Sequence, residues 1–288
     1  MISGTTKICG VMADPVEHSL SPLMQNFYAE KTGVDFAYMP LKVAVEDVEA
    51  AVLGAYALNF VCMNVTVQHK QQEMPYLKEI DEDAKAIGAV NTLVRMEGGY
   101  KGYNTDAAGL LRAMREAKIQ LAGEDCILIG AGGAAKAAAY VLAKEGAQTV
   151  TLLNRHVGHA MVLAEEINHR FGRPVMTVLA LSEYALLPKK SYLAIQSTSV
   201  GMYPHSDHAP IEDPDFYRMI HTGVDIVYNP METKFMQYVS AAGGRVMNGF
   251  TMLLYQGIAA FELWNPGVKI SPQIVEEAGM QMRSRLKG

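Results

Sequence analysis

Two short polar runs in this chain end on groups that can move a proton. The first leaves the apolar stretch at 60–65 and reaches the amine of Lys70. The second follows a strand-like stretch, contains Asp106, and then begins a helix. An ammonium and a carboxylate on neighbouring strand ends can pass a proton to or from a substrate hydroxyl. We therefore expect Lys70 to act as general acid or base and Asp106 to orient the reacting hydroxyl.

Two further polar runs accompany this pair. The run at 88–92 carries Asn91, and we interpret it as a third strand end. Ser19 and Ser21 come near the start, where Ser21 is a typical helix N-cap and Pro22 suits the first helical position. In order and spacing, the four runs resemble the shikimate dehydrogenase family over almost the whole chain. The resemblance implies an NADP-dependent enzyme of chorismate and aromatic amino acid biosynthesis, which reversibly reduces 3-dehydroshikimate to shikimate.

The resemblance also implies a set of substrate-binding residues. The family's counterparts of Ser19 and Ser21 bind the substrate carboxylate, and hydroxyls at a helix N-terminus suit an anion. Ser21 can instead serve only as a helix cap, and Tyr38 is a further candidate, although an aromatic residue on a strand is usually part of the core. Three residues match family positions that hydrogen-bond the ring hydroxyls: Thr66, Asn91 and Gln256.

A glycine-rich turn follows the apolar strand expected at 126–129. Gly130-x-Gly132-x-x-Ala135 has the spacing of a dinucleotide fingerprint and leads into an alanine-rich helix that ends near Glu145. Such a turn brings backbone N–H groups up to a pyrophosphate. A plain tight turn between strand and helix is the alternative. The cofactor-binding residues that we expect are Gly130, Gly132, Gly133, Ala134, Asn154, Arg155 and Gly249.

The end of the next strand favours NADP over NAD. Enzymes that use NAD usually carry an acidic residue there, whereas this chain has Asn154 and Arg155. An arginine suits a 2′-phosphate. His156 and His159 stand where the family usually has Thr and a second basic residue, so the preference for NADP is expected to be shallow or pH-dependent. NAD remains open as the alternative cofactor.

Two other positions depart from the family pattern. Gln68 stands where proline is usual, which loosens the turn that aims Lys70. Gln196 replaces an asparagine in the loop that lies beside the nicotinamide in the family, so cofactor positioning is open to change there. Neither departure removes a group that does chemistry.

The elements that position these residues alternate along the chain. Apolar runs predict strands and amphipathic stretches predict helices, which indicates an α/β fold with a mostly parallel sheet followed by a Rossmann-like NADP-binding domain. We expect a substrate-binding catalytic domain at 1–105, a dinucleotide-binding domain at 106–248, and C-terminal helices at 249–288 that return to the first domain. The expected strands are 7–13, 37–43, 60–65, 126–129, 149–153, 193–196 and 224–227, and the expected helices 21–32, 45–56, 106–117, the alanine-rich one, 252–264 and a C-terminal one.

Composition excludes several classes of protein. The 288 residues are half apolar and carry a formal net charge of −5 without a basic cluster, so we expect no nucleic acid partner. The chain shows no signal sequence and no apolar run of membrane length, so we expect a cytoplasmic monomer or homodimer. The three cysteines (Cys9, Cys62 and Cys126) are expected to be buried free thiols. His205 and His208 are expected in a solvated loop rather than at a metal.

Two alternatives to the main interpretation remain. Quinate or an amino-substituted relative would fit the same reaction, because discrimination among ring substituents depends on fine placement. A ligand-binding paralogue without activity would keep the fold but would not need both Lys70 and Asp106.

Overall fold

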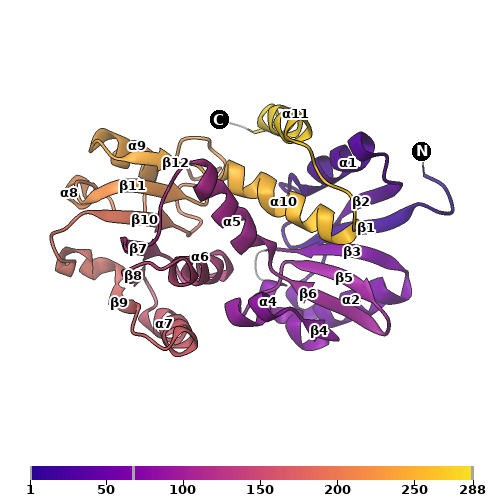
Figure 1. Ribbon diagram of the computed structural model, residues 1–288, viewed down its shortest axis with the longest axis horizontal. Helices are drawn as coiled ribbons and strands as arrows, with labels where there is room; N and C mark the ends of the chain where they lie inside the picture. The colour runs from indigo at the N-terminus through magenta and orange to yellow at the C-terminus, as the bar shows by residue number, and fades with distance from the viewer. Residues whose placement is uncertain (1, 67–68, 287–288) are drawn as a thin grey trace. The chain divides into compact units, whose positions relative to one another are not determined.

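Alternating apolar and amphipathic runs build an α/β chain, and the computed structural model describes its residues 2–66 and 69–286 (Figure 1). The chain divides into a first unit, Met1–Gly109 with Leu254–Arg285, and a second unit, Leu110–Leu253. α5 (Thr105–Glu116) and α10 (Phe250–Trp264) each continue from one unit into the other. Which unit binds which ligand stays a prediction. Gln68 lies outside the described residues, so its effect also stays a prediction.

The first unit contains a six-stranded sheet of order β2-β1-β3-β5-β6-β4. The strands of this sheet are β1 (Lys7–Ala13), β2 (Phe36–Lys42), β3 (Phe60–Val65), β4 (Glu79–Ile80), β5 (Thr92–Met96) and β6 (Gly99–Tyr103). Between them come α1 (Ser21–Thr32), η1 (Val45–Asp47), α2 (Val48–Ala57), α3 (His69–Gln72), η2 (Met74–Tyr76) and α4 (Glu82–Ile87), and α11 (Pro272–Arg283) follows α10. Only β5 runs antiparallel to its neighbours. The expected mostly parallel sheet is confirmed.

The reversed strand β5 changes the interpretation of Asn91. This residue directly precedes β5, so the prediction that the run at 88–92 is a strand end was wrong. Because β5 is antiparallel to β3, with Asn64 opposite Thr92, the start of β5 lies at the same sheet edge as the end of β3. The reversal therefore brings Asn91 to the end of the sheet at which β3 finishes.

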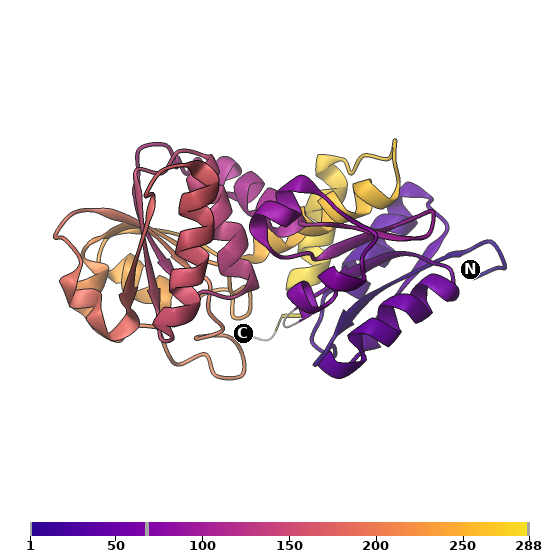
Figure 2. The same cartoon turned by 90° about the horizontal axis from the view of Figure 1, so that it is seen from below.

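Helices cover both faces of the first sheet. α2 lies on one face and α1 with α10 on the other (Figure 2). α10 passes so near α1 that a Cβ added to Gly257 would lie 2.1 Å from the Met24 side chain. The indole N–H of Trp264, at the end of α10, donates to the Leu93 carbonyl at 3.0 Å. These contacts confirm that the C-terminal helices return to the first unit.

The start of α1 differs from the prediction by one residue. The helix begins at Ser21, Leu20 occupies the N-cap position, and no side chain caps the helix. Leu20 already has helical dihedral angles, φ −83° and ψ −7°, so the chain enters the helix one residue earlier than a serine cap requires. The Ser21 hydroxyl is therefore not used as an N-cap. The helix ends as expected at Gly33, whose φ is 70°.

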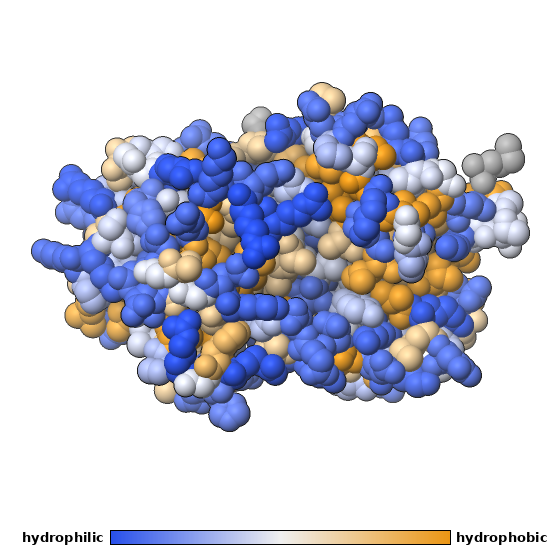
Figure 3. Space-filling view, in the orientation of Figure 1, coloured by the Kyte–Doolittle hydropathy of each residue, from blue (hydrophilic) through white to orange (hydrophobic). Residues whose placement is uncertain are grey.

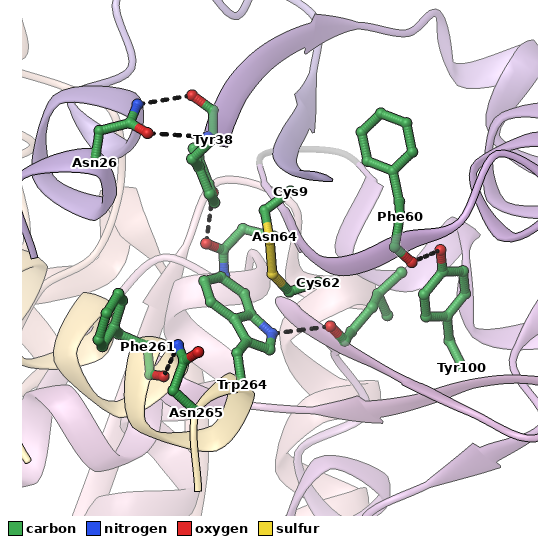
Figure 4. Close-up of a disulfide and its surroundings, with 11 residues drawn as sticks. Cys9, Asn26, Tyr38, Phe60, Cys62, Asn64, Tyr100, Phe261, Trp264 and Asn265 are labelled. Carbon is green, nitrogen blue, oxygen red and sulfur yellow. Dashed lines mark hydrogen bonds between the residues drawn. A yellow bond between two sulfur atoms is a disulfide. The ribbon is translucent and has the colours of Figure 1, made fainter. Parts of the chain in front are cut away.

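A disulfide between Cys9 and Cys62 overturns the expectation of free thiols at these two positions (Figure 4). The two residues are register partners on the adjacent parallel strands β1 and β3, and their Cα atoms are 4.8 Å apart. That separation lies within the range that a disulfide spans. Sequence spacing could not show this, because the pairing depends on strand register. Cys126 is a buried free cysteine, as expected.

The second unit is a parallel sheet of the Rossmann order, β12-β11-β10-β7-β8-β9. Its strands are β7 (Asp125–Ile129), β8 (Thr149–Asn154), β9 (Met176–Ala180), β10 (Tyr192–Gln196), β11 (Ile220–Asp225) and β12 (Arg245–Met247). Its remaining helices are α6 (Gly133–Lys144), α7 (Val157–Phe171), η3 (Leu181–Leu186), α8 (Pro214–Tyr217) and α9 (Lys234–Ala241). The expected Rossmann-like fold is confirmed.

Polar side chains cover much of the face shown in Figure 3, with apolar patches between them. Exposed large apolar residues occur in both units; they include Leu53, Leu58, Leu186 and Met280. Single exposed apolar residues are normal on a protein surface. Within the described ranges, no helix is both long enough and apolar enough to cross a membrane.

Candidate active site

Lys70 and Asp106 form a partly buried ion pair. The Lys70 Nζ lies 2.5 Å from the Asp106 Oδ2, and the two side chains are 13% and 8% exposed. Lys70 lies on α3, just beyond β3, and Asp106 lies in the first turn of α5, just beyond β6. A carboxylate near a helix N-terminus is stabilised by the helix dipole. The structure thus brings together the two groups that the sequence predicted to exchange a proton with a substrate.

The first turn of α5 is anchored by two asparagines. The Asn91 Oδ1 accepts the backbone N–H of Thr105 at 2.8 Å, and the Asn91 Nδ2 donates to the Thr105 Oγ1 at 3.0 Å. The Asn104 Oδ1 accepts the N–H of Ala107 at 3.1 Å. These bonds satisfy N–H groups that would otherwise lack a partner at a helix start. They fix the position of Asp106, which lies between Thr105 and Ala107.

Asn64 is a buried polar residue at this edge that sequence reasoning missed. Its Nδ2 donates to the Asn91 carbonyl and to the Thr92 Oγ1, both at 3.0 Å. Its Oδ1 accepts the Tyr38 hydroxyl at 2.6 Å (Figure 4). The signal was present in the sequence, because Asn64 interrupts an apolar strand two residues before Thr66.

Tyr38 combines a buried ring with a polar contact. Its ring is 3% exposed and packs against Trp264, with the ring centroids 6.0 Å apart. Burial raises the pKa of Tyr38 well above its ordinary value, and a hydrogen bond from the Ser21 side chain opposes this rise. Ser21 and Tyr38 are therefore neighbours, and Ser21 is linked through Tyr38 to Asn64.

Ser19, Ser21, Thr66 and Gln256 are all partly exposed residues of the first unit. The Ser21 N–H donates to the Ser19 Oγ at 3.3 Å, so the two serines are held together. The Thr66 N–H donates to the Met12 carbonyl at 3.2 Å, which ties the end of β3 to β1. Gln256 lies on α10, one residue before the close contact with α1. Direct contact of these side chains with substrate stays a prediction.

The glycine-rich turn in the second unit has the expected form. Gly130 follows β7 with φ 108°, and a Cβ there would lie 2.8 Å from the Ser197 Oγ. Gly132 precedes α6, and a Cβ on it would meet nothing within 4 Å, so the turn offers open space in front of the helix. Ala135 is fully buried. Such a turn permits close approach of a phosphate to the helix N-terminus, which is the feature that a dinucleotide needs.

A cavity of about 300 Å³ adjoins this turn. Gly130 and Gly132 line it on one side, and Asn154, Arg155 and His156 line it at the end of β8. Arg155 also lines a neighbouring cavity of about 390 Å³, together with Glu212. The carboxylate of Glu212 is already engaged, since it accepts the Ala209 N–H and the Tyr238 hydroxyl, both at 2.9 Å. The arginine is exposed beside the cavity where a 2′-phosphate would need a cation.

Three of the expected cofactor residues are not among those that line this cavity. Gly133 and Ala134 form the start of α6 directly behind the turn. Gly249 packs against backbone, because a Cβ on it would lie 2.0 Å from the Ile226 carbonyl oxygen. The lack of space for a side chain therefore explains the glycine at this position, and no ligand is needed to explain it. Its predicted contact with cofactor is untested.

Gln196 fits its position well, although the family usually has an asparagine there. It is fully buried, and its Nε2 donates to the carbonyls of Thr198 and Val200, both at 3.1 Å. Its Oε1 accepts the Thr198 N–H at 2.5 Å. The Nε2 also lies 3.4 Å from the Asp225 Oδ1. Gln196 therefore organises the loop that follows β10 and borders the cavity.

His208 contacts a carboxylate in its own loop. Its Nδ1 lies 3.6 Å from the Glu212 Oε1, and the His208 side chain is 73% exposed. In the described part of the chain, no group of three or more potential metal-ligating side chains gathers at one place.

Two family models match the chain. One describes a shikimate dehydrogenase substrate binding domain and matches residues 11–93. The other describes a shikimate/quinate 5-dehydrogenase and matches residues 112–201. Among similar proteins, a shikimate dehydrogenase (NADP(+)) of Carboxydothermus hydrogenoformans is 37% identical over 277 residues, 95% of this chain and 98% of the relative. One of Desulforamulus reducens is 40% identical, over 91% of each chain.

Solved structures agree with these relatives. A crystal structure of a shikimate dehydrogenase in complex with NADP+ has a TM-score of 0.87 and 36% identity, and covers 98% of this chain and 97% of its own. A shikimate 5-dehydrogenase from Listeria monocytogenes, in complex with shikimate and NAD, has a TM-score of 0.87 and 30% identity, with 96% and 97% covered. With an intact lysine–aspartate pair, a glycine-rich nucleotide turn and relatives of matching length, the chain belongs to the shikimate dehydrogenase family.

Proposed function

We propose that this chain catalyses the reversible, NADP-dependent interconversion of 3-dehydroshikimate and shikimate. The observation that carries the proposal is the Lys70–Asp106 pair, with 2.5 Å between its charged atoms. Relatives that cover nearly the whole chain are named NADP-dependent shikimate dehydrogenases, and one similar structure contains NADP+.

Lys70 and Asp106 have different roles at the reacting oxygen: Lys70 transfers the proton, and Asp106 orients the hydroxyl. In the direction of reduction, the Lys70 ammonium donates a proton to the carbonyl oxygen, which becomes the hydroxyl of the product. In the reverse direction, neutral Lys70 removes the same proton. Asp106 orients the hydroxyl and stabilises the ammonium form of Lys70 through their short contact. NADPH, when bound, supplies the hydride that reduces the carbonyl carbon and leaves as NADP+.

In this proposal, polar side chains of the first unit contact the substrate. Ser19 and Ser21, which are bonded to one another, bind the carboxylate. The ring hydroxyls are bound by Thr66 and Gln256 and by one Nδ2 proton of Asn91, since the Asn91 oxygen is engaged by Thr105. Tyr38, with its hydroxyl on Asn64, acts as a support for this network.

The turn and cavity of the second unit supply the cofactor contacts. Gly130 and Gly132 let backbone reach the pyrophosphate, and the first residues of α6, Gly133 and Ala134, contribute N–H groups there. Asn154 and Arg155 bind the ribose and its 2′-phosphate. Gly249 contributes indirectly, because it lets the chain pass close to Ile226.

A specific observation keeps a second candidate open. The family model for residues 112–201 names both shikimate and quinate, and the Listeria structure contains NAD. A dehydrogenase that accepts quinate, NAD or both is therefore the alternative. A paralogue without activity is disfavoured, because mere ligand binding does not require the buried Lys70–Asp106 pair.

The cellular setting belongs to this proposal as well. We infer a monomer or homodimer that acts in the cytoplasm on small molecules, and the net charge of −5 disfavours nucleic acid as a partner. The Cys9–Cys62 disulfide is unusual for a reducing compartment. Thiol labelling of the protein inside cells would show whether these cysteines are oxidised there.

The proposal is tested by assaying purified protein with shikimate and with quinate, each with NADP and with NAD. We expect shikimate with NADP to give the highest kcat/KM. Lys70→Ala should lower kcat by roughly 10²–10⁴-fold, the span for losing a general acid or base. Asp106→Asn should also act mainly on kcat. Lys85→Ala, which removes an exposed lysine paired with Glu82, is the matched control and should retain wild-type rates. Wild-type turnover in Lys70→Ala would contradict the assignment.

A further inference from the structure

A glutamine side chain is buried between two helices of the first unit. Gln25 is 0% exposed, and it lies with Met24, Tyr28 and Ala29 among the buried residues of α1. Its Nε2 donates to the Gly257 carbonyl of α10 at 3.0 Å, although the two residues are 232 positions apart in the sequence. Gln25 therefore bonds α1 directly to the helix that returns to the first unit.

The other polar atom of this amide is unsatisfied. The Gln25 Oε1 is buried and has no hydrogen-bond partner among the residues that the structure describes. A buried acceptor without a partner costs free energy of folding, so a methionine of the same length would fill the space at lower cost. Apolar contacts are non-directional, whereas a hydrogen bond favours one arrangement of the two helices. The amide is thus better suited to fixing the relative position of α1 and α10 than to stabilising the fold.

The two helices pack closely around this bond. A Cβ added to Gly257 would lie 2.1 Å from the Cε of Met24, 2.7 Å from its Sδ and 3.4 Å from the Gln25 Nε2. About one helical turn further along both helices, the rings of Tyr28 and Phe261 meet edge to face, with their centroids 5.7 Å apart. Within this close contact, the amide of Gln25 adds a directional bond.

Each helix carries a predicted substrate contact next to this bond. Ser21 precedes Gln25 by four residues, so the two side chains lie on the same face of α1. Gln256 directly precedes Gly257 on α10. In the proposed function, Ser21 binds the substrate carboxylate and Gln256 binds a ring hydroxyl. The bond from Gln25 to Gly257 therefore sets the spacing of two groups that must hold one small molecule at the same time.

Both helices are also bonded to the sheet. The Asn26 Nδ2 donates to the Tyr38 carbonyl at 2.8 Å, and the Tyr38 N–H donates to the Asn26 Oδ1 at 2.9 Å, so α1 is fixed against β2 (Figure 4). α10 is bonded to the sheet through Trp264, about two turns beyond Gly257. Loss of the Gln25 bond is therefore expected to displace the part of α10 that contains Gln256.

We propose that Gln25 is a positioning residue for the substrate. Through Gly257 it fixes Gln256 relative to Ser21, and its own burial keeps it from touching the substrate. This inference rests on the proposed function, because it assumes that the first unit binds shikimate. Loss of the bond should weaken the binding of shikimate but not of NADP, because the glycine-rich turn belongs to the second unit.

The first test compares Gln25→Met with wild type. Methionine keeps the length and removes the donor, so KM for shikimate should rise roughly three- to tenfold, the range for losing one hydrogen bond to a ligand. KM for NADP should stay unchanged, and the Tm should stay the same or rise, because a buried polar group is removed. Gln273→Met, at an exposed glutamine of α11, is the matched control and should resemble wild type in all three quantities. A lower Tm with both KM values unchanged would show a structural role only and would overturn the proposal.

A second pair of variants displaces α10 without changing the amide. Gly257→Ala places a methyl against the fully buried Met24, so KM for shikimate should again rise while KM for NADP does not. Adding Met24→Val removes the two atoms that this methyl would meet first and should return KM for shikimate toward the wild-type value. If Gly257→Ala left this KM unchanged, or if Met24→Val did not reverse its rise, the spacing of the two helices would not control substrate binding and the proposal would be wrong.

Calorimetric titration with shikimate, with no cofactor present, separates this inference from the proposed function. The Kd for shikimate should rise in Gln25→Met by about the same factor as KM. Wild type that neither binds nor oxidises shikimate would refute the proposed function, and the role of Gln25 with it. Wild type and Gln25→Met that bind shikimate equally well would refute the role of Gln25 alone.

Discussion

The side chain of Asn91 forms hydrogen bonds with Thr105 through both of its polar atoms. Its Oδ1 accepts the Thr105 N–H at 2.8 Å, and its Nδ2 donates to the Thr105 Oγ1 at 3.0 Å. Thr105 immediately precedes Asp106, so Asn91 connects the start of β5 to the carboxylate of the Lys70–Asp106 ion pair.

Asn91→Ala should therefore lower both stability and turnover. Loss of the acceptor for the Thr105 N–H should reduce the free energy of unfolding by about 0.5–2 kcal/mol, as for a lost helix cap. The loosened helix start should misplace Asp106 and lower kcat. Denaturant unfolding and steady-state kinetics measure the two effects. Thr105→Val keeps the hydrogen bond from the residue 105 N–H to Asn91, so it should lose less stability and less turnover than Asn91→Ala. If Asn91→Ala raised KM and left stability and kcat unchanged, Asn91 would have a role in substrate binding alone.

Arg155 should determine the preference for NADP over NAD. It is the cation that lines both cavities beside the end of β8, and a guanidinium binds a phosphate through two parallel hydrogen bonds. Charge-assisted bonds contribute about 1.5–3 kcal/mol, so Arg155→Ala should lower the ratio of kcat/KM for NADP over NAD by roughly ten- to a hundredfold. Arg170→Ala, an exposed arginine at the end of α7, is the control.

The same preference should depend on pH. The rings of His156 and His159 lie 5.9 Å apart near Arg155, and imidazoles attract a phosphate only when they are protonated. The NADP to NAD ratio should increase as pH falls from about 8 to 6. A wild-type ratio below one, or a ratio that Arg155→Ala does not change, would identify NAD as the working cofactor.

Asp225 should make stability depend on pH. Desolvation raises the pKa of this fully buried carboxyl to about 7, although Thr233 and Val227 donate hydrogen bonds to it. Because the folded-state pKa is raised, the carboxyl's contribution to stability is complete below about pH 4 and is lost as pH rises to about 7. Urea unfolding of wild type should show this loss, of about 2–4 kcal/mol, relative to Asp225→Asn. Parallel pH dependences in the two proteins would contradict it.

The thiol content should report the disulfide. Protein unfolded without reductant should expose one reactive thiol, that of Cys126, and three after reduction. The bond closes a segment with a sequence separation of 53, so reduction should lower the free energy of unfolding by about 2–4 kcal/mol. Cys126→Ser should abolish the thiol signal seen before reduction. Three reactive thiols in unreduced protein would show that Cys9 and Cys62 are not bonded.

The sequence was most informative where local chemistry and local structure coincide. Lys70 and Asp106 could be predicted because each follows an apolar strand in a short polar run, and β1 and β3 have the predicted bounds. The strand expected at 224–227 was displaced: β11 occupies Ile220–Asp225. Its start contains polar His221 and Thr222, so the apolar run marks only its end.

Features that depend on register or on burial were not predictable in this way. The Cys9–Cys62 bond requires that the two cysteines be opposite one another on adjacent strands, which spacing along the chain does not reveal. The Glu73 carboxyl is fully buried and has no hydrogen-bond partner among the described residues. Its burial likewise depends on tertiary packing, because its sequence neighbours Gln71 and Gln72 are exposed.

Gln196 has a consequence for exchanging parts between relatives. Its amide bonds to backbone at both Thr198 and Val200, a reach that fits this loop with this side-chain length. Asparagine is one methylene shorter, so it cannot make the same set of bonds without a shift of the loop. Residue 196 and the loop that follows β10 therefore have to be exchanged together. A chimera that takes only one of them from a relative would disturb the loop where it lines the cavity beside the glycine-rich turn.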